Sequence, residues 1–138
     1  MRGLFGHSRE KWQIFMEDEA LRMALEGDHP ILASLRRQTP FIRAREREWT
    51  GKGFFTDLTL RNEVVPCDPQ EVFGLHGVGG TSRSMREGFS FIIWVEGGLL
   101  ATIEGVANGR KWKPSQTFDM KLETKFRSAL SYPIQLDI

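Results

Sequence analysis

Apolar residues recur at helical spacing through the first 40 residues of the chain. In SREKWQIFMEDEALRMALEG they stand three or four positions apart, at Trp12, Phe15, Met16, Ala20, Met23 and Ala24, which is the spacing of an amphipathic helix. Ser8 is suited to cap the start of this helix, and Gly27 follows its end. A second helix is predicted over PILASLRRQ, with Asp28 as its cap and Pro40 beyond its end.

The apolar period changes to two from residue 41 onwards. In FIRAREREW the alternate positions form one face with Phe41, Arg43, Arg45, Arg47 and Trp49 and another with Ile42, Ala44, Glu46 and Glu48. The run FFTDLTL alternates in the same way, and the short glycine-containing link TGKG predicts a β-hairpin. RNEVVPCDPQ, with its two prolines, is predicted to be a loop, and EVFGLHG a short strand.

The clearest strand pattern is GFSFIIWVEGGLLATIEGV, in which two β-rich runs flank Gly97 and Gly98. This glycine pair favours a two-residue hairpin turn, because both central residues of such a turn need a positive φ. Pairing across the turn is expected to align Val95 with Leu100, Ile93 with Thr102 and Phe91 with Glu104. The run from Phe91 to Val95 is apolar on both faces, which predicts a central strand covered on both sides.

Two more strands are predicted towards the C-terminus, over FDMKLETKF and, as an edge strand, over PIQLDI. Helices followed by hairpin-connected strands indicate the α+β class. We therefore expect a single domain over residues 1–138, helical over 1–40 and mainly β over 41–138. Its N-terminal helices are expected to pack on one face of a mostly antiparallel sheet of about six to seven strands.

Composition narrows the classes of partner. The 138 residues carry 19 Lys and Arg against 18 Asp and Glu, for a net charge of +1, so no overall field attracts nucleic acid or acidic membranes. The single cysteine, Cys67, excludes an internal disulfide and fits a reducing cytoplasm. The N-terminus lacks the apolar core of a signal peptide, and FIIWV is far shorter than a membrane span. We expect a cytoplasmic protein that binds neither nucleic acid nor membrane.

The glycine-rich stretch GLHGVGGTSR, residues 74–83, is close to a phosphate-binding loop. That loop needs a lysine after its second glycine and a helix behind it to bind phosphate. Here Gly80 occupies the lysine position, and a strand pattern follows in place of a helix. We therefore expect a mobile connection between strands, and no cofactor.

Three residues are candidates for catalysis: Glu104, His76 and Asp57. Glu104 is expected on the same face as Phe91 and Ile93, where a carboxylate needs either a proton or a paired cation. It can equally form a structural ion pair with an arginine. His76 could act as a general base beside an acidic residue, although a structural histidine is the simpler interpretation. No other histidine or cysteine stands at ligand spacing near it, which argues against a metal site.

The alternating arginines 43, 45 and 47 offer two interpretations. Between Phe41 and Trp49 they are similar to a nucleic-acid face, in which arginines meet phosphates and aromatic rings stack on bases. The interleaved glutamates and the near-neutral chain favour the other interpretation. In that one the arginines pair with acidic neighbours such as Glu17, Asp18 and Glu19.

Two segments resemble a group of short uncharacterised bacterial proteins: WTGKGFFTDL (49–58) and GFSFIIWVEGGLLATIEGVANGRKWKP (88–114). The shared features are a TGxGFFT-like segment and a later apolar strand, glycine turn and LEG-like strand ending near Trp-Pro. In this chain Lys113 separates Trp112 from Pro114. The resemblance covers about a third of the chain. Because its motifs consist of strand and turn residues, it implies a fold and no activity.

The expected function is therefore a non-catalytic domain that binds a protein partner or its own copy, an accessory role similar to that of immunity proteins. Four tryptophans and ten phenylalanines exceed the obvious needs of a small core, and surplus aromatic side chains are typical of interfaces. The alternative is an enzyme or small-molecule binder with a pocket between the helices and a curved sheet, using Glu104, His76 or Asp57. A homodimer is expected if the C-terminal strand is an exposed edge.

Overall fold

Two helices open the chain. The computed structural model describes residues 2–109, 111–112, 121–124 and 131–132. Helix α1 spans Arg2–Ala24 and α2 spans Pro30–Gln38, followed by a 3-10 turn, η1, at Thr39–Phe41. α2 has the predicted bounds, but its cap is not Asp28: the Nδ1 atom of His29 accepts a hydrogen bond of 3.1 Å from the Ile31 N–H. α1 begins earlier than predicted, so Ser8 lies inside the helix.

The remaining described elements form an antiparallel sheet. Its five long strands are β1 (Ile42–Trp49), β2 (Gly53–Leu60), β3 (Phe73–Thr81), β4 (Phe89–Glu96) and β5 (Leu99–Ala107), in the order β1-β2-β5-β4-β3. Two short segments, β6 (Lys121–Thr124) and β7 (Ser131–Tyr132), pair with β3. The predicted α+β class with an antiparallel sheet is confirmed. The predicted strand over PIQLDI lies outside the described residues.

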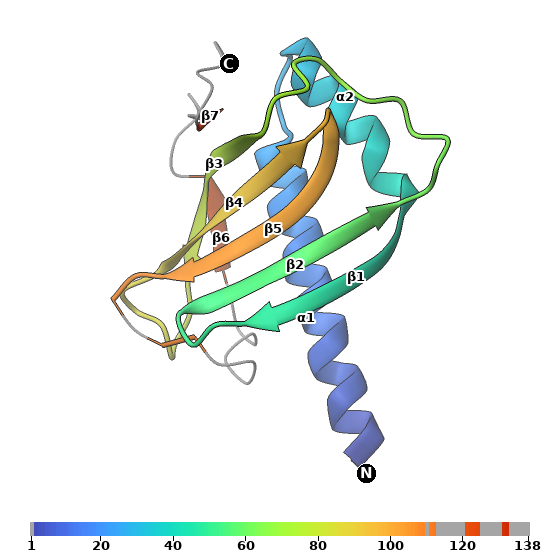
Figure 1. The fold of residues 1–138 in the computed structure, drawn as a ribbon. Helices are drawn as coiled ribbons and strands as arrows, with labels where there is room; N and C mark the ends of the chain where they lie inside the picture. Colours follow the sequence, from blue (N-terminus) through green and yellow to red (C-terminus); the bar gives the residue numbers. More distant parts are fainter. Residues whose placement is uncertain (1, 110, 113–120, 125–130, 133–138) are drawn as a thin grey trace.

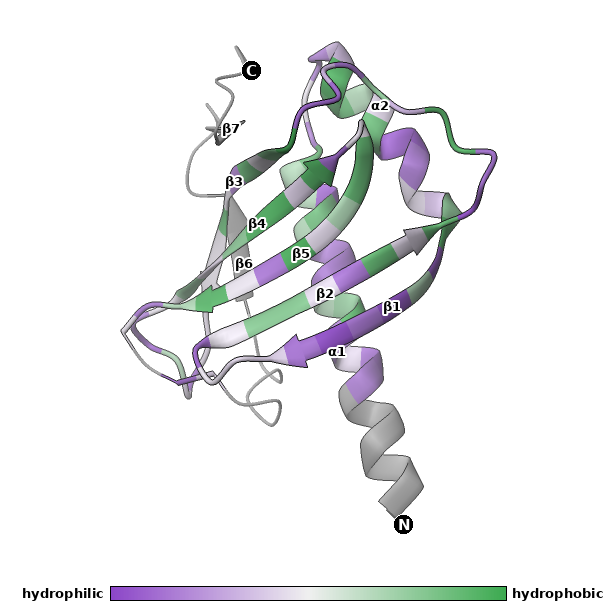
Figure 2. Cartoon of the chain, in the orientation of Figure 1, coloured by the Kyte–Doolittle hydropathy of each residue, from purple (hydrophilic) through white to green (hydrophobic). Residues whose placement is uncertain are grey.

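The core lies between α1, α2 and the sheet, with α1 crossing behind the strands in Figure 1. Its centre is a group of aromatic rings in which Trp112 stands 4.9 Å from Phe89 and 5.1 Å from Phe54, measured between ring centroids. Leucines of both helices, including Leu21 of α1 and Leu35 of α2, are buried in the same core, together with Leu25 just beyond the end of α1. Figure 2 shows the contrast between the apolar strand β4 and the polar strand β1. The centre of the space between helices and sheet is therefore filled by side chains. At its edge a pocket of about 460 Å³ remains between α1, α2 and β1, lined by Asp18, Leu21, Arg22, Leu25, Arg36, Thr39, Pro40, Ile42 and Arg45.

The glycine-rich stretch is not the connection that the sequence predicts. Residues 73–81 form the single strand β3, in which Gly74 pairs with Trp94 and Gly79 with Ser90. A bulge between Leu75 and Val78 accommodates Gly77, whose φ is 115°. Both glycines of the phosphate-loop pattern are thus committed to the sheet ladder, with their backbone bonded to neighbouring strands. The actual connection to β4 is the segment 82–88.

The β4–β5 hairpin turns at the predicted glycines, with φ of 61° at Gly97 and 77° at Gly98. The first predicted pair, Val95 with Leu100, is also correct. Beyond it the register shifts by one residue, because a bulge lies between Trp94 and Val95. The observed pairs are then Ile93 with Ile103, Phe91 with Gly105 and Ile92 with Glu104.

Candidate functional site

One side of the sheet is left uncovered by both described helices, and we call it the open face. On the other side Thr56 reaches α1 through a hydrogen bond to Glu17, so the alternate residues of β2 point away from the helices. Following the pairing across β1, β2, β5 and β4 assigns twelve side chains to the open face: Ala44, Glu46, Glu48, Phe55, Asp57, Thr59, Ser90, Ile92, Trp94, Thr102, Glu104 and Val106.

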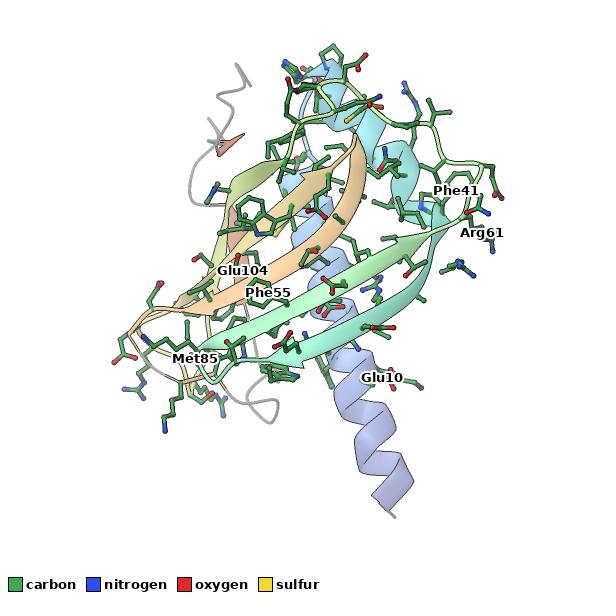
Figure 3. The ribbon with its side chains drawn as sticks, in the orientation of Figure 1. Glu10, Phe41, Phe55, Arg61, Met85 and Glu104 are labelled. Atoms are coloured by element: carbon green, nitrogen blue, oxygen red, sulfur yellow. The ribbon has the colours of Figure 1, made fainter. Side chains whose placement is uncertain are left out.

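Glu104 is on this open face and not on the apolar inner face expected from the sequence. A one-residue shift of register moves every following side chain to the opposite face of a strand, and the bulge at Trp94 produces that shift. Glu104 stands between Phe55 on β2 and Ile92 on β4. Its Oε1 accepts a hydrogen bond of 2.9 Å from the indole N–H of Trp94. Figure 3 shows Glu104 and Phe55 on the side of the sheet that faces the viewer, with α1 behind it.

The aromatic part of the open face is formed by Phe55 and Trp94. The side chain of Phe55 is 37% exposed, and Trp94 is half-buried. Gly74 on β3 lies directly beneath the Trp94 ring, because a Cβ atom there would come within 3.0 Å of it. The indole is therefore held flat against the sheet by a glycine on one side and by its hydrogen bond to Glu104 on the other. This arrangement gives a rigid platform at the surface.

The charged side chains among the twelve of the open face are all acidic. Four of the twelve are carboxylates, from Glu46, Glu48, Asp57 and Glu104, and none of the twelve is basic. The exposed Arg43 stands at the bulge between Ile42 and Ala44 and is not among the paired positions. Asp57 accepts a hydrogen bond of 3.0 Å from the Thr102 hydroxyl. Glu46 stands directly opposite Asp57 in the ladder, and like charges in directly opposed positions destabilise a sheet. The arrangement thus carries an electrostatic cost within the free protein.

A notch opens beside Asp57, where β2 and β5 separate. Pairing between these strands ends at Asp57 and Thr102, although β2 continues to Leu60 and β5 begins at Leu99. The start of β5 bends away from β2 towards α2 (Figure 1). The resulting open pocket has a volume of about 520 Å³ and is lined by Asp57, Leu58, Leu60, Arg61, Asn62, Val64, Glu96, Leu99, Leu100, Ala101 and Thr102.

Gln38, the last residue of α2, closes the inner side of the sheet at this point. Its side chain is 1% exposed and its amide makes three hydrogen bonds. The Nε2 atom donates to the carbonyl oxygens of Gly98 and Val65, at 2.9 and 3.2 Å, and Oε1 accepts from the Leu100 N–H at 2.9 Å. The amide therefore takes the place of a neighbouring strand for β5, which lets the two strands part without leaving the Leu100 N–H unsatisfied.

A second polar group lies on the helix side of the sheet, around the fully buried carboxylate of Glu17. Arg45 and Arg47 of β1 reach it at 2.9 and 2.8 Å, and Thr56 and Gln13 donate hydrogen bonds to it at 2.6 and 2.8 Å. Burial by itself would raise the pKa of Glu17. The hydrogen bonds from Arg47, Thr56 and Gln13, with the charge of Arg47, hold that pKa below its usual value.

The expected pairing of the β1 arginines with α1 is present for Arg45 and Arg47, at Glu17 and Asp18. Arg43, at the bulge between Ile42 and Ala44, is exposed and forms no ion pair with the described residues. Glu19 instead pairs with Arg22 of its own helix. Burial would lower the pKa of Arg45, but its hydrogen bonds to Asp18 and Glu17 raise it. The complete burial of Glu17 could not be inferred from alternation in one strand, because it depends on where α1 crosses the sheet. Since Arg45, Arg47, Thr56 and the Gln13 amide all bind the Glu17 carboxylate, this group joins helix to sheet.

Of the three candidates from the sequence, the structure brings two together. Asp57 and Glu104 lie on the open face of neighbouring strands. His76 lies on β3, which is separated from β5 by β4. Its Nε2 atom is buried and makes no hydrogen bond to the described residues. The structure therefore places two of the three candidates on one face of the sheet and His76 two strands away from Glu104.

Other features of the described residues add no further site. Cys67 is buried in the loop after β2, where its N–H donates to the Gly98 carbonyl at 2.8 Å. Burial raises the pKa of its thiol, which opposes formation of a reactive thiolate. No group of three or more His, Cys, Asp or Glu in the described part of the chain could hold a metal ion. Within the same residues, no helix is long and apolar enough to cross a membrane.

Comparison of the chain with models of protein families, with curated proteins and with solved structures finds no match. The inference about function therefore rests on the open face and the notch.

Proposed function

We propose that the chain is a non-catalytic protein-binding domain. In this proposal the N-terminal helices cover one face of a sheet of six to seven strands, and the open face binds a basic segment of a partner protein. The observation that carries the proposal is the combination of four carboxylates, no basic side chain among the twelve assigned positions, an exposed Phe55 and a half-buried Trp94 on that face. An accessory, immunity-like role fits this surface, because an acidic face can cover the basic region of a partner.

The uneven distribution of charge supports a cationic partner. The whole chain has a net charge of +1, yet the twelve side chains assigned to the open face carry four negative charges and no positive one. Opposed carboxylates such as Glu46 and Asp57 destabilise the free protein, and a bound cation would remove that repulsion. The same charges repel phosphate, so this face is unsuited to nucleic acid.

The aromatic residues give the face a position for an anchoring contact. Phe55 and Trp94 lie on either side of Glu104, so that a carboxylate and two rings border the same spot. Arginine binds well in such surroundings, because its guanidinium can stack on an aromatic face while it donates hydrogen bonds to a carboxylate. Trp94 is held in place by Glu104 and by the close approach of Gly74, so little conformational entropy is lost on binding.

The proposal is tested with three fluorescent peptides of equal length that have arginine, glutamine or glutamate at the same positions. We expect the arginine peptide to bind the full chain at least about tenfold more tightly than the glutamine peptide, measured by fluorescence anisotropy. The double variant Glu48→Gln and Glu104→Gln should lose this preference, since it removes two charges and keeps the side-chain shapes.

Asp28→Asn is the matched control, because it also removes one exposed carboxylate but lies between the two helices. It should leave the affinity for the arginine peptide unchanged. Equal binding of the three peptides, or an equal effect of the control, would show that the open face is not the binding surface.

The second candidate is the small-molecule binder or enzyme. One observation favours it: Asp57 lines an open pocket of about 520 Å³, within the size range of ligand pockets. That pocket lies at the parting of β2 and β5 and contains one of the three candidate residues. Between the helices and the sheet, where such a pocket was expected, the centre is filled by the aromatic core. The pocket of about 460 Å³ at the edge between α1, α2 and β1 is lined by none of the three candidate residues. The protein-binding proposal uses more of the open face and is preferred.

A further inference from the structure

We propose that the notch between β2 and β5 is a subsite for one arginine or lysine side chain of the partner. This inference rests on the proposed function and identifies where the basic segment is anchored. It is carried by three properties of the notch: an apolar floor, a fixed carboxylate at its inner end, and backbone groups that are already bonded.

The apolar floor comes from the two strands where they part. Leu58 and Leu60 line the notch from β2, and Leu99 and Leu100 line it from β5. These side chains suit the long aliphatic stem of lysine or arginine, which packs on apolar surface while its charged end remains in contact with water or with a carboxylate. A short polar side chain would leave this floor uncovered.

The carboxylate of Asp57 stands at the point where the strands meet. Its Oδ1 accepts the Thr102 hydroxyl at 3.0 Å, whereas Oδ2 makes no hydrogen bond to the described residues. The Thr102 bond fixes the orientation of the group and leaves one oxygen for a cationic donor. Glu96 adds a second carboxylate to the lining. Arg61 lies four residues beyond Asp57, a distance of about 13 Å along an extended chain. It therefore borders the end of the notch that is opposite Asp57.

The bonded backbone at the notch decides between a side chain and an inserted strand. A partner strand would need free N–H and C=O groups along the parted edges. The Leu100 N–H and the Gly98 carbonyl are already bonded to the Gln38 amide. Insertion of a strand would have to displace a fully buried amide, whereas a side chain can enter without breaking any of these hydrogen bonds.

The test uses two small probes, acetyl-arginine N-methylamide and its uncharged counterpart acetyl-citrulline N-methylamide, added to the ¹⁵N-labelled full chain. We expect the arginine probe to shift the backbone amides of residues 57–60 and 99–102 in a saturable way. Its affinity should exceed that of the citrulline probe by about fivefold. Asp57→Asn should remove that difference, and Asp28→Asn should preserve it.

The outcomes separate this inference from the function on which it rests. Equal binding of both probes, or shifts that leave residues 57–60 and 99–102 unchanged, would overturn the notch as a cation subsite. If the arginine peptide still binds through Glu48 and Glu104 in that case, the proposed function stands without the subsite. If neither the peptide nor the probe binds, both proposals are wrong.

Discussion

Glu17 is the residue of α1 whose side chain binds both β1 and β2. It is a fully buried carboxylate whose partners all belong to the described chain. A buried ion pair adds little stability by itself, but removal of one member leaves the other charges without compensation. Arg45 and Arg47 have 14 and 16% exposed side chains, so water can compensate them only in part.

The first prediction concerns Glu17→Gln. This variant keeps the side-chain shape and removes the charge, so the free energy of unfolding at neutral pH should fall by about 3 kcal/mol, measured by urea denaturation. Glu19→Gln is the control, because the Glu19 carboxylate pairs with an exposed arginine at the surface, and its effect should be close to zero. A Glu17 variant as stable as the wild type would contradict a structural role for this group.

The second prediction is the pH dependence of the same group. Burial raises the pKa of Glu17, but its hydrogen bonds outweigh burial and hold the pKa below the usual 4.5. Because the folded pKa is the lower one, the stabilisation is complete above about pH 4.5 and is lost as the pH falls through the folded value. Urea denaturation at several acidic pH values should show a weaker pH dependence for Glu17→Gln. The same dependence in both proteins would assign acid unfolding to other carboxylates.

The third prediction concerns Glu46, which stands opposite Asp57 on the open face. Glu46→Thr removes the repulsion between them and introduces a residue that favours strands, so it should stabilise the protein by about 0.5 kcal/mol. It should also weaken binding of the arginine peptide. Glu48→Thr is the comparison, because Glu48 stands opposite Phe55. This variant should stabilise the protein less than Glu46→Thr does. Loss of stability in Glu46→Thr would show that the paired carboxylates carry no cost.

The β4–β5 hairpin shows how far an element can be predicted from sequence. Gly97 and Gly98 identified the turn correctly, because only a few residues adopt the positive φ that it needs. The bulge at Trp94 and Val95 could not be inferred from the sequence. Apolar and polar residues alternate in the same way along each strand whether or not the pairing between the two strands contains a bulge. This one residue moved Glu104 from the expected inner face to the open face.

In the stretch GLHGVGGTSR the sequence predicts a connection between strands, whereas the structure has a strand there. Glycine is usually a sign of a turn, but on β3 two glycines have a packing reason. Gly74 makes room for Trp94, and Gly77 adopts a φ of 115° at a bulge. Such reasons depend on neighbouring strands, which the local sequence does not reveal. The arginines of β1, in contrast, were matched to acidic residues of α1 because both patterns are regular.

The fourth prediction compares the two turn glycines. Gly97 has open space around it, so Gly97→Asn should be nearly neutral, because asparagine tolerates its φ of 61°. A Cβ atom at Gly98 would stand 2.2 Å from the Cys67 carbonyl oxygen, so Gly98→Ala should destabilise by about 2 kcal/mol or more. Thermal unfolding of both variants measures the difference. An equal loss of stability in the two variants would contradict the close packing of the 61–72 loop on this turn.

On the scale of the whole molecule, the two sides of the sheet differ in the burial and the pairing of their charges. The inner side holds the core and the neutralised Glu17 group, and the open face retains four carboxylates that form no ion pair with the described residues. Binding that depends on these exposed charges should weaken steeply as salt is raised, because charges beyond about 10 Å are screened at 0.1 M. The helix–sheet join, whose charges are buried, should respond much less to salt.

The most direct measurement of the central claim is the indole N–H resonance of Trp94 in the ¹⁵N-labelled full chain as the arginine peptide is added. The indole donates to Glu104 on the open face, so its resonance should shift progressively and saturate. That of Trp112, which is 1% exposed in the core, should remain in place. If instead the Trp12 resonance on α1 shifts and that of Trp94 does not, the partner binds to the helix and the account of the open face is wrong.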